Sequence, residues 1–263
     1  MKYADTLKVS IPRCLISNGF VYMRIVGYLK TSFIEWPGKI AAVLFTPGCN
    51  FRCPFCHNSD LVDPAKMAKL STLKETEILA DLKKRKKWID GVVITGGEPT
   101  LQSDLASFLA KLKKLGFKTM IETNGSNPSV IRNLIIRKLV NFIAMDYKTT
   151  FSEYENVVKN KNQKSKIKKT MKLILESGLP FEFRTTVVPG IHSEQVLPEM
   201  ARELRNLNSE LLTLHSDLNW FLQSFRPKNC LEKKFNQIKP FTQEEMDKFL
   251  RSIQKIIKSV KLR

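Results

Sequence analysis

The sequence lacks the features that mark secreted, membrane-spanning or disordered chains. No run approaches the roughly 18 consecutive apolar residues that a transmembrane helix needs. The first residues, Met1 to Asp5, lack the basic and then apolar layout of a signal peptide. Low-complexity linkers and internal repeats are also missing, and 43% apolar content over 263 residues is ordinary for a globular core. These absences predict a cytoplasmic protein without a membrane partner.

Cysteine is scarce and unevenly placed. There are five cysteines, an odd number, and three of them fall within eight residues, which does not suit a disulfide framework. A reducing compartment and a metal or redox role are favoured instead. Cys14 and Cys230 stand alone and are predicted to be small buried side chains. The other three are Cys49, Cys53 and Cys56, spaced Cys-x3-Cys-x2-Cys.

The three-cysteine segment supplies one thiolate too few for a closed iron-sulfur site. Cubane clusters are normally held by four cysteine thiolates, so three would leave one iron free to bind something other than protein. Two alternatives stay open at this point. Cys53 and Cys56 could form a thioredoxin-type pair, which leaves Cys49 unexplained, or the cysteines could bind zinc together with His57. The zinc alternative requires His57 to turn onto the metal already held by its neighbour Cys56.

Acidic residues are few relative to basic ones. Lysine and arginine number 44 against 25 aspartates and glutamates, which gives a formal net charge of +19. The excess gathers at Lys83 to Lys87, Lys159 to Lys172 and Lys255 to Arg263. The positive electrostatic field of these clusters attracts acidic partners, and nucleic acid is not excluded. However, no aromatic residues alternate with the basic runs as they do in single-strand binding grooves.

Strand-like apolar runs alternate with helix-period segments six times, which predicts an α/β fold with parallel strands and crossover helices. Six units are too few for a closed eight-stranded barrel, so an open partial barrel is expected. Residues 1–39 lie outside this repeat and are predicted to be a short N-terminal extension, with Asn18-Gly19 as a turn. Residues 40–263 form the barrel with its C-terminal helix. The strands are predicted at 40–45, 91–95, 118–122, 141–146, 181–188 and 220–224.

The helices between these strands have recognisable starts and apolar faces. The last helix is predicted to bury a face that runs from Met246 to Val260. Helix starts are predicted at the capping-box pair Thr72 and Glu75, at Ser103, at Pro128, and at the second capping-box pair Thr242 and Glu245.

Unusual motifs follow the predicted strands in order. In strand-helix barrels the reacting groups lie at the carboxyl ends of the strands, so these motifs should meet at one rim. After the cysteine segment, which follows the first strand, they are Gly96-Gly97-Glu98-Pro99, Thr123-Asn124-Gly125, Asp146-Tyr147-Lys148, Val188-Pro189-Gly190 with Arg184 before it, and Gln223.

Two of these motifs resemble the signatures of the radical S-adenosylmethionine enzymes. The spacing Cys-x3-Cys-x2-Cys with an aromatic residue, Phe55, before the last cysteine is one, and Gly96-Gly97-Glu98-Pro99 is similar to the other. The resemblance implies an open (β/α)6 barrel, a [4Fe-4S] cluster and S-adenosyl-L-methionine as cofactors. It also implies the chemistry: an electron enters the cluster, the sulfonium bond breaks, and a 5′-deoxyadenosyl radical abstracts a hydrogen atom from a substrate.

The resemblance further implies a set of site residues. The three cysteines would be the catalytic and metal-binding residues, with one iron left for the amine and carboxylate of the cofactor. Phe55 would pack on the adenine, and His57 and Asn58 would lie near the nucleoside. The other implied cofactor-binding residues are Gly96, Gly97 and Glu98 at the amino group, Lys148 with Asp146 near the carboxylate, and Thr123, Asn124, Arg184 and Gln223.

A closer resemblance is to the glycyl-radical-enzyme activating proteins, especially those of anaerobic ribonucleoside-triphosphate reductases. It rests on the lead-in segment Thr31 to Lys39, on Glu122 to Gly125 and on Ile143 to Lys148. It implies a glycyl-radical enzyme as protein substrate and a flavodoxin- or ferredoxin-type electron donor. A monovalent cation is also implied, at Glu122, Thr123, Asp146 and the backbone of Ala144.

The sequence departs from these activating proteins at three points. Glu122 stands where relatives often have aspartate, and Gln223 where some have histidine. No cysteine-rich insert is present, which argues against auxiliary clusters. Two other functions stay open. One is a radical S-adenosylmethionine enzyme that modifies a nucleoside or RNA, which the net charge of +19 favours. The other is a basic nucleic-acid-binding module with a structural metal.

Overall fold

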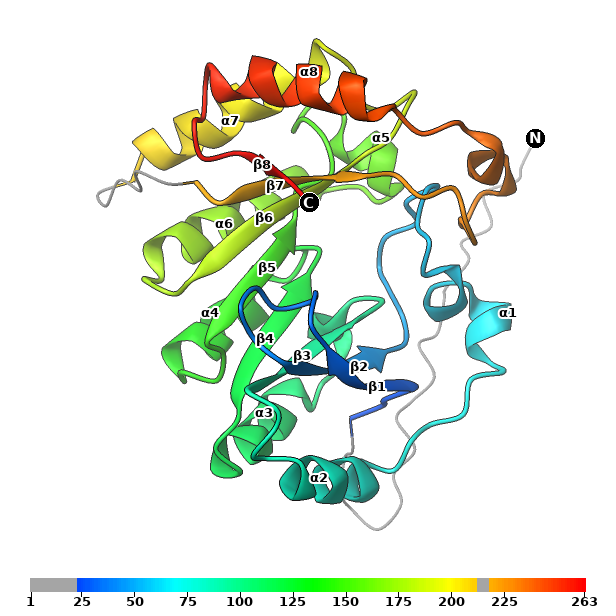
Figure 1. Cartoon of the computed structure of the whole chain (residues 1–263), viewed down its shortest axis with the longest axis vertical. Coiled ribbons are helices and arrows are strands. Elements are labelled where there is room, and N and C mark those ends of the chain that lie inside the picture. The colour runs from blue at the N-terminus through cyan, green and yellow to red at the C-terminus, as the bar shows by residue number, and fades with distance from the viewer. Residues whose placement is uncertain (1–22, 212–217) are drawn as a thin grey trace, which may run out of the picture.

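A single curved sheet organises the chain. The computed structural model describes residues 23–211 and 218–263, and within them the strands follow one another across the sheet in chain order (Figure 1). β1 is antiparallel to β2, and every later neighbour pair is parallel. The strands are β1 (Gly27–Ser32), β2 (Ala41–Thr46), β3 (Gly91–Gly96), β4 (Lys118–Thr123), β5 (Phe142–Asp146), β6 (Phe181–Val187), β7 (Trp220–Ser224) and β8 (Lys261–Leu262).

The six predicted strands are β2 to β7, and each lies within one residue of its predicted bounds. The two edge strands, β1 and β8, do not pair with each other in the described part of the chain, so the sheet stays open. The predicted α/β partial barrel is confirmed. β1 falls inside the predicted extension 1–39 yet continues the same sheet, and the division at residue 39 stays a prediction. Cys14 and the turn at Asn18-Gly19 lie outside the described residues.

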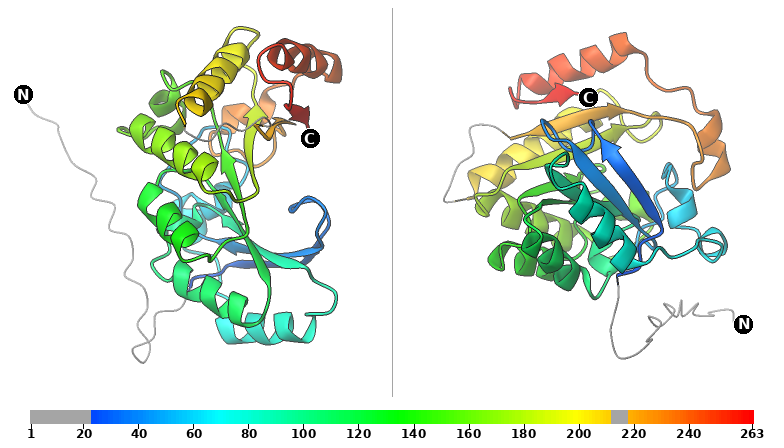
Figure 2. Two further views of the ribbon diagram at one scale, coloured as in Figure 1. Left: turned by 90° about the vertical axis from the view of Figure 1, so that its left-hand side faces the viewer. Right: turned by 60° about the horizontal axis from the view of Figure 1, so that its bottom comes forward.

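The helices cover the convex face of the sheet, as the two views of Figure 2 show. Two short helices, α1 and α5, were not predicted. Within 23–211 and 218–263 no helix is both long and apolar enough to cross a membrane. The helices are α1 (Pro64–Met67), α2 (Glu75–Lys84), α3 (Leu105–Lys114), α4 (Pro128–Ile136), α5 (Tyr154–Val158), α6 (Lys164–Glu176), α7 (Val196–Ser209) and α8 (Gln243–Gln254), with 3₁₀ turns at Ser59–Leu61, Pro99–Leu101 and Lys233–Gln237.

The last helix begins as predicted but ends early. The Thr242 hydroxyl accepts the Glu245 N–H at 3.2 Å, and the Glu245 carboxylate accepts the Thr242 N–H at 2.7 Å, which completes a capping box. The helix stops at Gln254, although its predicted apolar face continued to Val260. Ile257 and Val260 are still buried, because the chain turns back and adds β8 beside β7.

Two other predicted helix starts are wrong. α2 begins at Glu75 without a side-chain cap, so Thr72 does not form a capping box with Glu75. Glu75 is instead buried, and its carboxylate accepts the Met23 N–H at 3.4 Å. α3 follows Asp104 rather than Ser103, again without a side-chain cap. At Glu75 a tertiary contact takes the carboxylate that a local capping box would have used.

Apolar residues lie on both faces of the sheet, in unequal amounts. The larger core fills the space between the sheet and the helices. On the concave face a small cluster gathers around Trp36, which packs on Gly91 so closely that an added Cβ there would lie 2.6 Å from the ring. The segment that carries Trp36 thus closes the amino end of the concave face. Polar side chains are left to line its carboxyl end, where the predicted motifs lie.

Candidate cofactor site at the carboxyl rim

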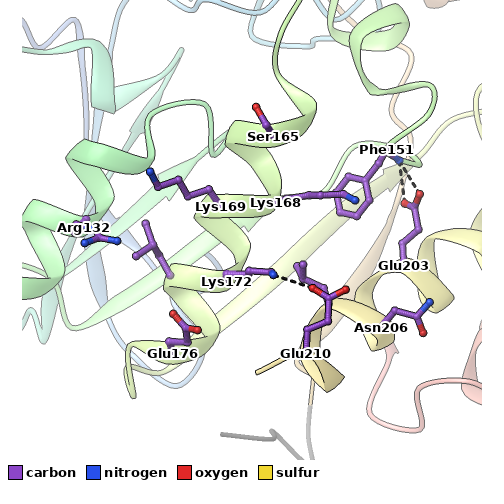
Figure 3. A pocket seen from close by; sticks show the side chains of 12 residues that line it. Arg132, Phe151, Ser165, Lys168, Lys169, Lys172, Glu176, Glu203, Asn206 and Glu210 are labelled. Atoms are coloured by element: carbon purple, nitrogen blue, oxygen red, sulfur yellow. Dashed lines mark hydrogen bonds and ion pairs between the residues drawn. The ribbon is translucent and has the colours of Figure 1, made fainter. Parts of the chain in front are cut away.

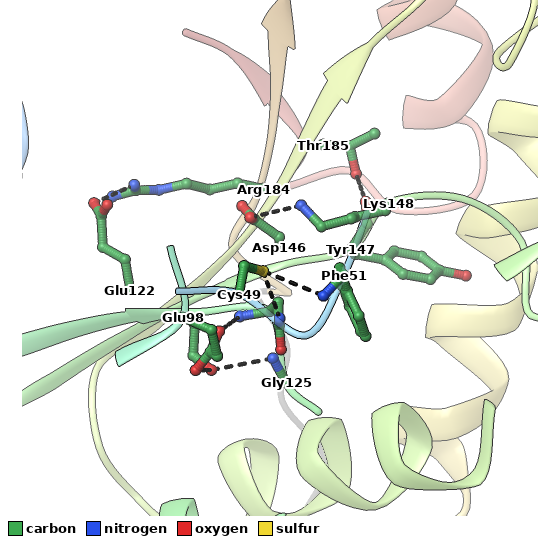
Figure 4. A network of polar contacts seen from close by, with 12 residues as sticks. Cys49, Phe51, Glu98, Glu122, Gly125, Asp146, Tyr147, Lys148, Arg184 and Thr185 are labelled. Atoms are coloured by element: carbon green, nitrogen blue, oxygen red, sulfur yellow. Dashed lines mark hydrogen bonds and ion pairs between the residues drawn. The ribbon is translucent and has the colours of Figure 1, made fainter. Parts of the chain in front are cut away.

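The structure brings the predicted motifs together at one rim. Parallel strands place their carboxyl ends at the same edge of the sheet, and the loops after β2 to β5 meet there (Figure 4). Residues from four of these loops and from β6 face a common region. They include Cys49 after β2, Glu98 after β3, Gly125 after β4, Asp146 and Lys148 at the end of β5, and Arg184 on β6.

The cysteine loop, residues 47–58, winds around its own thiols. Cys53 is buried, and Cys49 and Cys56 are half-buried. The Cys56 N–H donates to the Cys53 carbonyl at 3.1 Å, and the Phe51 N–H approaches the Cys49 sulfur at 3.3 Å. The Arg52 guanidinium donates to the carbonyls of Cys49 and Phe51 at 2.6 and 2.8 Å. The loop is therefore fixed by its own backbone before any ligand binds.

The environment of these thiols argues against both early alternatives. Burial raises the pKa of Cys49 and of Cys53 to about 12, and it raises the pKa of Cys56 as well. A thioredoxin-type thiol needs a lowered pKa and access, so the redox-pair alternative is disfavoured. Within the described ranges no three His, Cys, Asp or Glu side chains converge on one metal ion, which disfavours the zinc alternative with His57.

The paired glycines press two loops against each other. A Cβ on Gly96 would lie 2.2 Å from the Thr46 carbonyl oxygen, and one on Gly97 would lie 2.0 Å from that of Gly48. Gly96 also has φ of +128°, which side chains disfavour. The Glu98 N–H donates to the Gly48 carbonyl at 2.7 Å. Only glycine allows the β3 loop to support the start of the cysteine loop so closely.

Glu98 joins the loops after β3 and β4. Its side chain is fully buried, and its carboxylate accepts hydrogen bonds from the Thr100 N–H at 3.0 Å, the Thr123 hydroxyl at 2.8 Å and the Asn124 N–H at 2.6 Å. Burial raises the pKa of Glu98, although these bonds favour the carboxylate. Glu98 and Thr123, both predicted site residues, therefore contact each other directly.

Asn50 links the cysteine loop to two distant segments, and sequence reasoning missed it. The Asn124 side-chain amide donates to the Asn50 side chain at 2.9 Å and approaches the Cys49 sulfur at 3.7 Å. The Asn160 side-chain amide donates to the Asn50 carbonyl at 2.8 Å. In the sequence, the signal for a role of Asn50 was its position between Cys49 and Cys53. Asn160 offered none, because it lies in the lysine-rich stretch before α6.

Lys148 lies beside the cysteine loop and is paired with Asp146. The Lys148 amine is 2.8 Å from the Asp146 carboxylate, and the side chains are 15% and 47% exposed. Burial opposes the charge, but Asp146 and Cys53 outweigh it, so the pKa of Lys148 lies well above its usual value. The buried His192 accepts the Val188 N–H at 2.9 Å, and its Nε2 lies 2.9 Å from the Lys148 carbonyl. Sequence reasoning gave His192 no role.

A polar wall on the concave face surrounds Arg184. Its guanidinium contacts the carboxylates of Glu122 and Glu182, and the Thr95 hydroxyl donates to Glu122 at 2.7 Å. Burial opposes the charge, yet the two glutamates hold the pKa of Arg184 above its usual value. In this arrangement Glu122 contacts Arg184, whereas Thr123 contacts Glu98. The monovalent cation that would use Glu122 and Thr123 stays a prediction.

The other predicted residues of the cysteine loop have different environments. Phe55 is buried. The Asn58 side-chain amide donates to the Gly96 carbonyl at 3.4 Å, which ties the end of the loop to the glycine pair. The His57 residue is exposed, and its carbonyl accepts a hydrogen bond from the Asn229 amide at 3.3 Å. His57 thus contacts the protein through its backbone.

The segment after β7 covers the outside of the cysteine loop. Gln223 is half-buried on β7, in register with Thr186 of β6. Further along, the Glu232 N–H donates to the Pro54 carbonyl at 2.9 Å, and Cys230 is buried nearby. Cys56 contributes to a raised pKa of Cys230, after burial. The predicted burial of Cys230 is confirmed, and the structure adds its place next to the three-cysteine loop.

Known proteins resemble this chain in sequence and in fold. A family model described as the radical SAM superfamily matches residues 43–204. A protein of Methanocaldococcus jannaschii that carries the provisional name "glycyl-radical enzyme activating enzyme" is 32% identical over 244 residues, 91% of this chain and 95% of its own length. The pyruvate formate-lyase-activating enzyme of Clostridium pasteurianum is 27% identical over 73% of this chain and 82% of its own length.

Among solved structures, SuiB of Streptococcus suis bound to S-adenosylmethionine has a TM-score of 0.61 at 16% identity, with 84% of this chain covered. This chain spans about half the length of SuiB, so the likeness concerns the fold alone. The family match and the first relative establish the class. The chain belongs to the radical SAM superfamily and is an enzyme of that superfamily.

The residues at the rim fit the cofactors that this superfamily uses, a [4Fe-4S] cluster and S-adenosylmethionine. The donor set is three thiols on one loop, which suits a cubane because such a cluster spreads its cysteine ligands over separate irons. Their raised pKa values mean that each proton must be displaced by the metal. The buried amine of Lys148 adds positive charge next to the loop, as an anionic cluster or a carboxylate requires.

Proposed function

We propose that this enzyme activates a glycyl-radical enzyme, and that its partner is an anaerobic ribonucleoside-triphosphate reductase. The observation that carries the first part is 32% identity across 91% of the chain to a protein named for glycyl-radical enzyme activation. The choice of partner is supported by the lead-in segment Thr31 to Lys39 and the motifs at Glu122 to Gly125 and Ile143 to Lys148. The substrate is then a backbone glycine of a large protein.

In this proposal Cys49, Cys53 and Cys56 hold the cluster. When bound, cluster and cofactor supply one-electron reduction of S-adenosylmethionine: one electron and the glycine hydrogen atom convert it to methionine and 5′-deoxyadenosine and leave a glycyl radical. The chain's own task is to hold the cysteine loop, orient the cofactor and exclude water. Arg52 and Asn50 fix the loop backbone through hydrogen bonds. The loops after β3 and β4 also form hydrogen bonds with this loop.

The remaining rim residues are proposed to bind S-adenosylmethionine. Lys148 supplies a cation for the carboxylate, and His192 holds Lys148 by its backbone. Glu98 acts on the amino group by fixing the β3 and β4 loops, since its carboxylate already accepts several hydrogen bonds from them. The rest of the set contributes from the cysteine loop and the strands: Phe55, His57, Asn58, Gly96, Gly97, Thr123, Asn124, Asp146, Arg184 and Gln223.

The open side of the barrel suits a macromolecular substrate. β1 and β8 leave a gap in the sheet among the described residues, and the concave face between them carries the Arg184 wall. A loop of a partner protein can approach such an open face. The net charge of +19 would assist association with an acidic partner and an acidic electron donor.

The proposal is tested by mixing the reduced, cluster-loaded enzyme with S-adenosylmethionine and the anaerobic reductase of the same organism. We expect 5′-deoxyadenosine and a glycine-centred doublet in electron paramagnetic resonance, in matching amounts. Cys53→Ala should abolish both, and a reductase whose radical glycine is replaced by alanine should give no doublet. If no doublet forms with any glycyl-radical enzyme of that organism, the proposed function is wrong.

A second function is favoured by one observation, the net charge of +19, which would suit a nucleoside-containing polyanion. This enzyme would then modify RNA or a nucleoside. The same assay separates the two functions. Formation of 5′-deoxyadenosine that requires RNA or a free nucleoside, and not the reductase, would establish the second.

A further inference from the structure

A lysine-bearing segment lies directly against the outside of the cysteine loop. It connects α5 to α6 and spans residues 159–163. The Arg52 N–H donates to the Val158 carbonyl at 2.9 Å, and the Asn160 side chain donates to the Asn50 carbonyl at 2.8 Å. Asn50 is the immediate neighbour of Cys49. The Asn160 side chain therefore connects this segment directly to the backbone of the loop that carries the three cysteines.

The conformation of this segment is fixed by its own hydrogen bonds. Lys159 and Asn162 both have left-handed backbones, with φ of 54° and 59°. Gln163 is buried, and its side-chain amide donates to the Asn160 side chain at 3.1 Å and to the Lys161 carbonyl at 2.9 Å. The Glu155 carboxylate accepts the Gln163 N–H at 2.9 Å. Non-glycine residues keep such backbones only where surrounding contacts hold them, so the segment presents a set surface.

Three exposed lysines project from this set surface, namely Lys159, Lys161 and Lys164, which we call the Lys159 patch. Among the described residues, the lysines that form ion pairs with carboxylates are others, and none of these three does so. The chain from Phe151 to Lys172 holds seven lysines against two glutamates, Glu153 and Glu155. The Glu155 carboxylate is engaged with the start of α6, so the surface beside the cysteine loop is strongly positive.

Two lysines further along α6, Lys168 and Lys172, have contacts outside the patch. Figure 3 shows them lining a hollow on the outer helical layer. The volume of this hollow is about 590 Å³. Lys172 pairs with Glu210 of α7 at 2.8 Å, and the Lys168 amine lies 4.6 Å from the centre of the Phe151 ring. With Glu176, Glu203 and Glu210 among its lining residues, this hollow carries charges of both signs.

We propose that the Lys159 patch is the docking surface for an acidic one-electron carrier protein of the flavodoxin or ferredoxin class. The proposal rests on the radical S-adenosylmethionine chemistry, which requires one electron per turnover. The carrier loses one electron and the cluster gains it, with no bond made or broken. Electron transfer weakens steeply with distance, so the carrier must dock beside the cysteine loop. The patch is positive, and it flanks Asn160, whose side chain contacts that loop.

An RNA ligand fits this surface less well than an acidic protein. Single-strand binding surfaces combine positive charge with aromatic side chains on which bases stack. The stretch from Lys159 to Lys172 contains no aromatic residue. Charge alone, held at a fixed site, favours recognition of a protein that carries a complementary negative surface.

The test is a charge reversal with a matched control. The patch variant carries Lys159→Glu, Lys161→Glu and Lys164→Glu. The control variant reverses Lys83, Lys84 and Lys87, three exposed lysines at the end of α2. That end of α2 leads into the amino end of β3, at the opposite rim from the cysteine loop, so both variants change net charge equally but only one changes the patch.

Both cluster-loaded variants are mixed with reduced flavodoxin, and cluster reduction is followed by stopped-flow absorbance. We expect the patch variant to be reduced at least about tenfold more slowly than the control at low salt, with the difference shrinking as salt rises. Reduction by dithionite should stay unchanged in both. This readout uses no glycyl-radical enzyme, so it can succeed even if the proposed partner is wrong.

Equal slowing in the two variants, or an unchanged rate in the patch variant, would overturn the proposal. Patch-dependent, salt-sensitive binding of single-stranded RNA together with an unchanged flavodoxin rate would also overturn it and assign the surface to RNA. If the triple variant does not take up iron, the single change Lys161→Glu replaces it. We then expect a smaller loss of rate of the same salt dependence, and no loss would be decisive against the patch.

Discussion

Protonation of His192 should destabilise the fold between about pH 6.5 and pH 4. His192 is 3% exposed and bridges the ends of β5 and β6. Its Nδ1 accepts the Val188 N–H, so the ring must be neutral with its proton on Nε2, which donates to the Lys148 carbonyl. A proton on Nδ1 would oppose the Val188 N–H. Burial lowers the pKa of His192 from 6.5 to about 4, against the hydrogen bond to the Lys148 carbonyl.

The magnitude follows from the difference between the folded and unfolded pKa. As pH falls below 6.5, the unfolded chain binds a proton at this histidine while the native state does not, so the free energy of unfolding decreases. The loss is complete near pH 4 and amounts to about 3 kcal/mol, at about 1.36 kcal/mol for each unit of pKa. Above pH 6.5 both states are neutral and the contribution is constant.

The assay is urea unfolding of the cluster-free chain, followed by tryptophan fluorescence at several pH values from 7.5 to 4.5. His192→Phe removes the titrating group and leaves the Val188 N–H and the Lys148 carbonyl without their partner, at about 1–3 kcal/mol each near neutral pH. We expect the gap between wild type and His192→Phe to narrow as pH falls, by up to about 3 kcal/mol. His57→Phe, at an exposed residue whose pKa is also lowered by burial, should flatten the profile less than His192→Phe does.

Parallel pH profiles for wild type and His192→Phe would refute this reasoning. So would a directly measured value: a ring titration of His192 near pH 6.5 in nuclear magnetic resonance would show that its burial and hydrogen bonds do not hold it neutral.

Three further predictions concern the rim. Anaerobically reconstituted protein should hold about four irons and four sulfides per chain; Cys53→Ala should lose them and Cys230→Ala should keep them, and the reverse result in iron and sulfide analysis would contradict the ligand assignment. Lys148→Ala should keep the cluster but weaken S-adenosylmethionine binding about ten- to a hundredfold, because a charge-assisted contact is typically worth about 1.5–3 kcal/mol; an unchanged titration would make Lys148 a structural charge only. Gly97→Ala should reduce cluster uptake, because its Cβ would overlap the Gly48 carbonyl. The control Gly38→Ala has no atom within 4 Å of its Cβ and should cost only about 1–2 kcal/mol of backbone strain. Equal iron content in the two variants would show that the β3 loop can move aside.

The sequence alone determined the class of this protein and the order of its parts. Alternation of apolar runs with helical segments located β2 to β7 within one residue, because buried parallel strands are rich in apolar residues. The spacing of Cys49, Cys53 and Cys56 and the motifs after each strand placed the site at one rim, because the carboxyl ends of parallel strands share an edge. These are local patterns, and one chain segment is enough to show each of them.

Tertiary structure decided what those motifs contact. Glu98 reaches the β4 loop, Asn160 reaches Asn50 across 110 positions of chain, and His192 joins Lys148 to the end of β6. Such contacts depend on how the loops pack, which a local pattern does not encode. The same holds for the failed cap at Glu75, where a buried partner outcompeted the helix terminus. Local sequence therefore set the elements and the cysteine motif, whereas packing between distant loops set the contacts that hold the site in place.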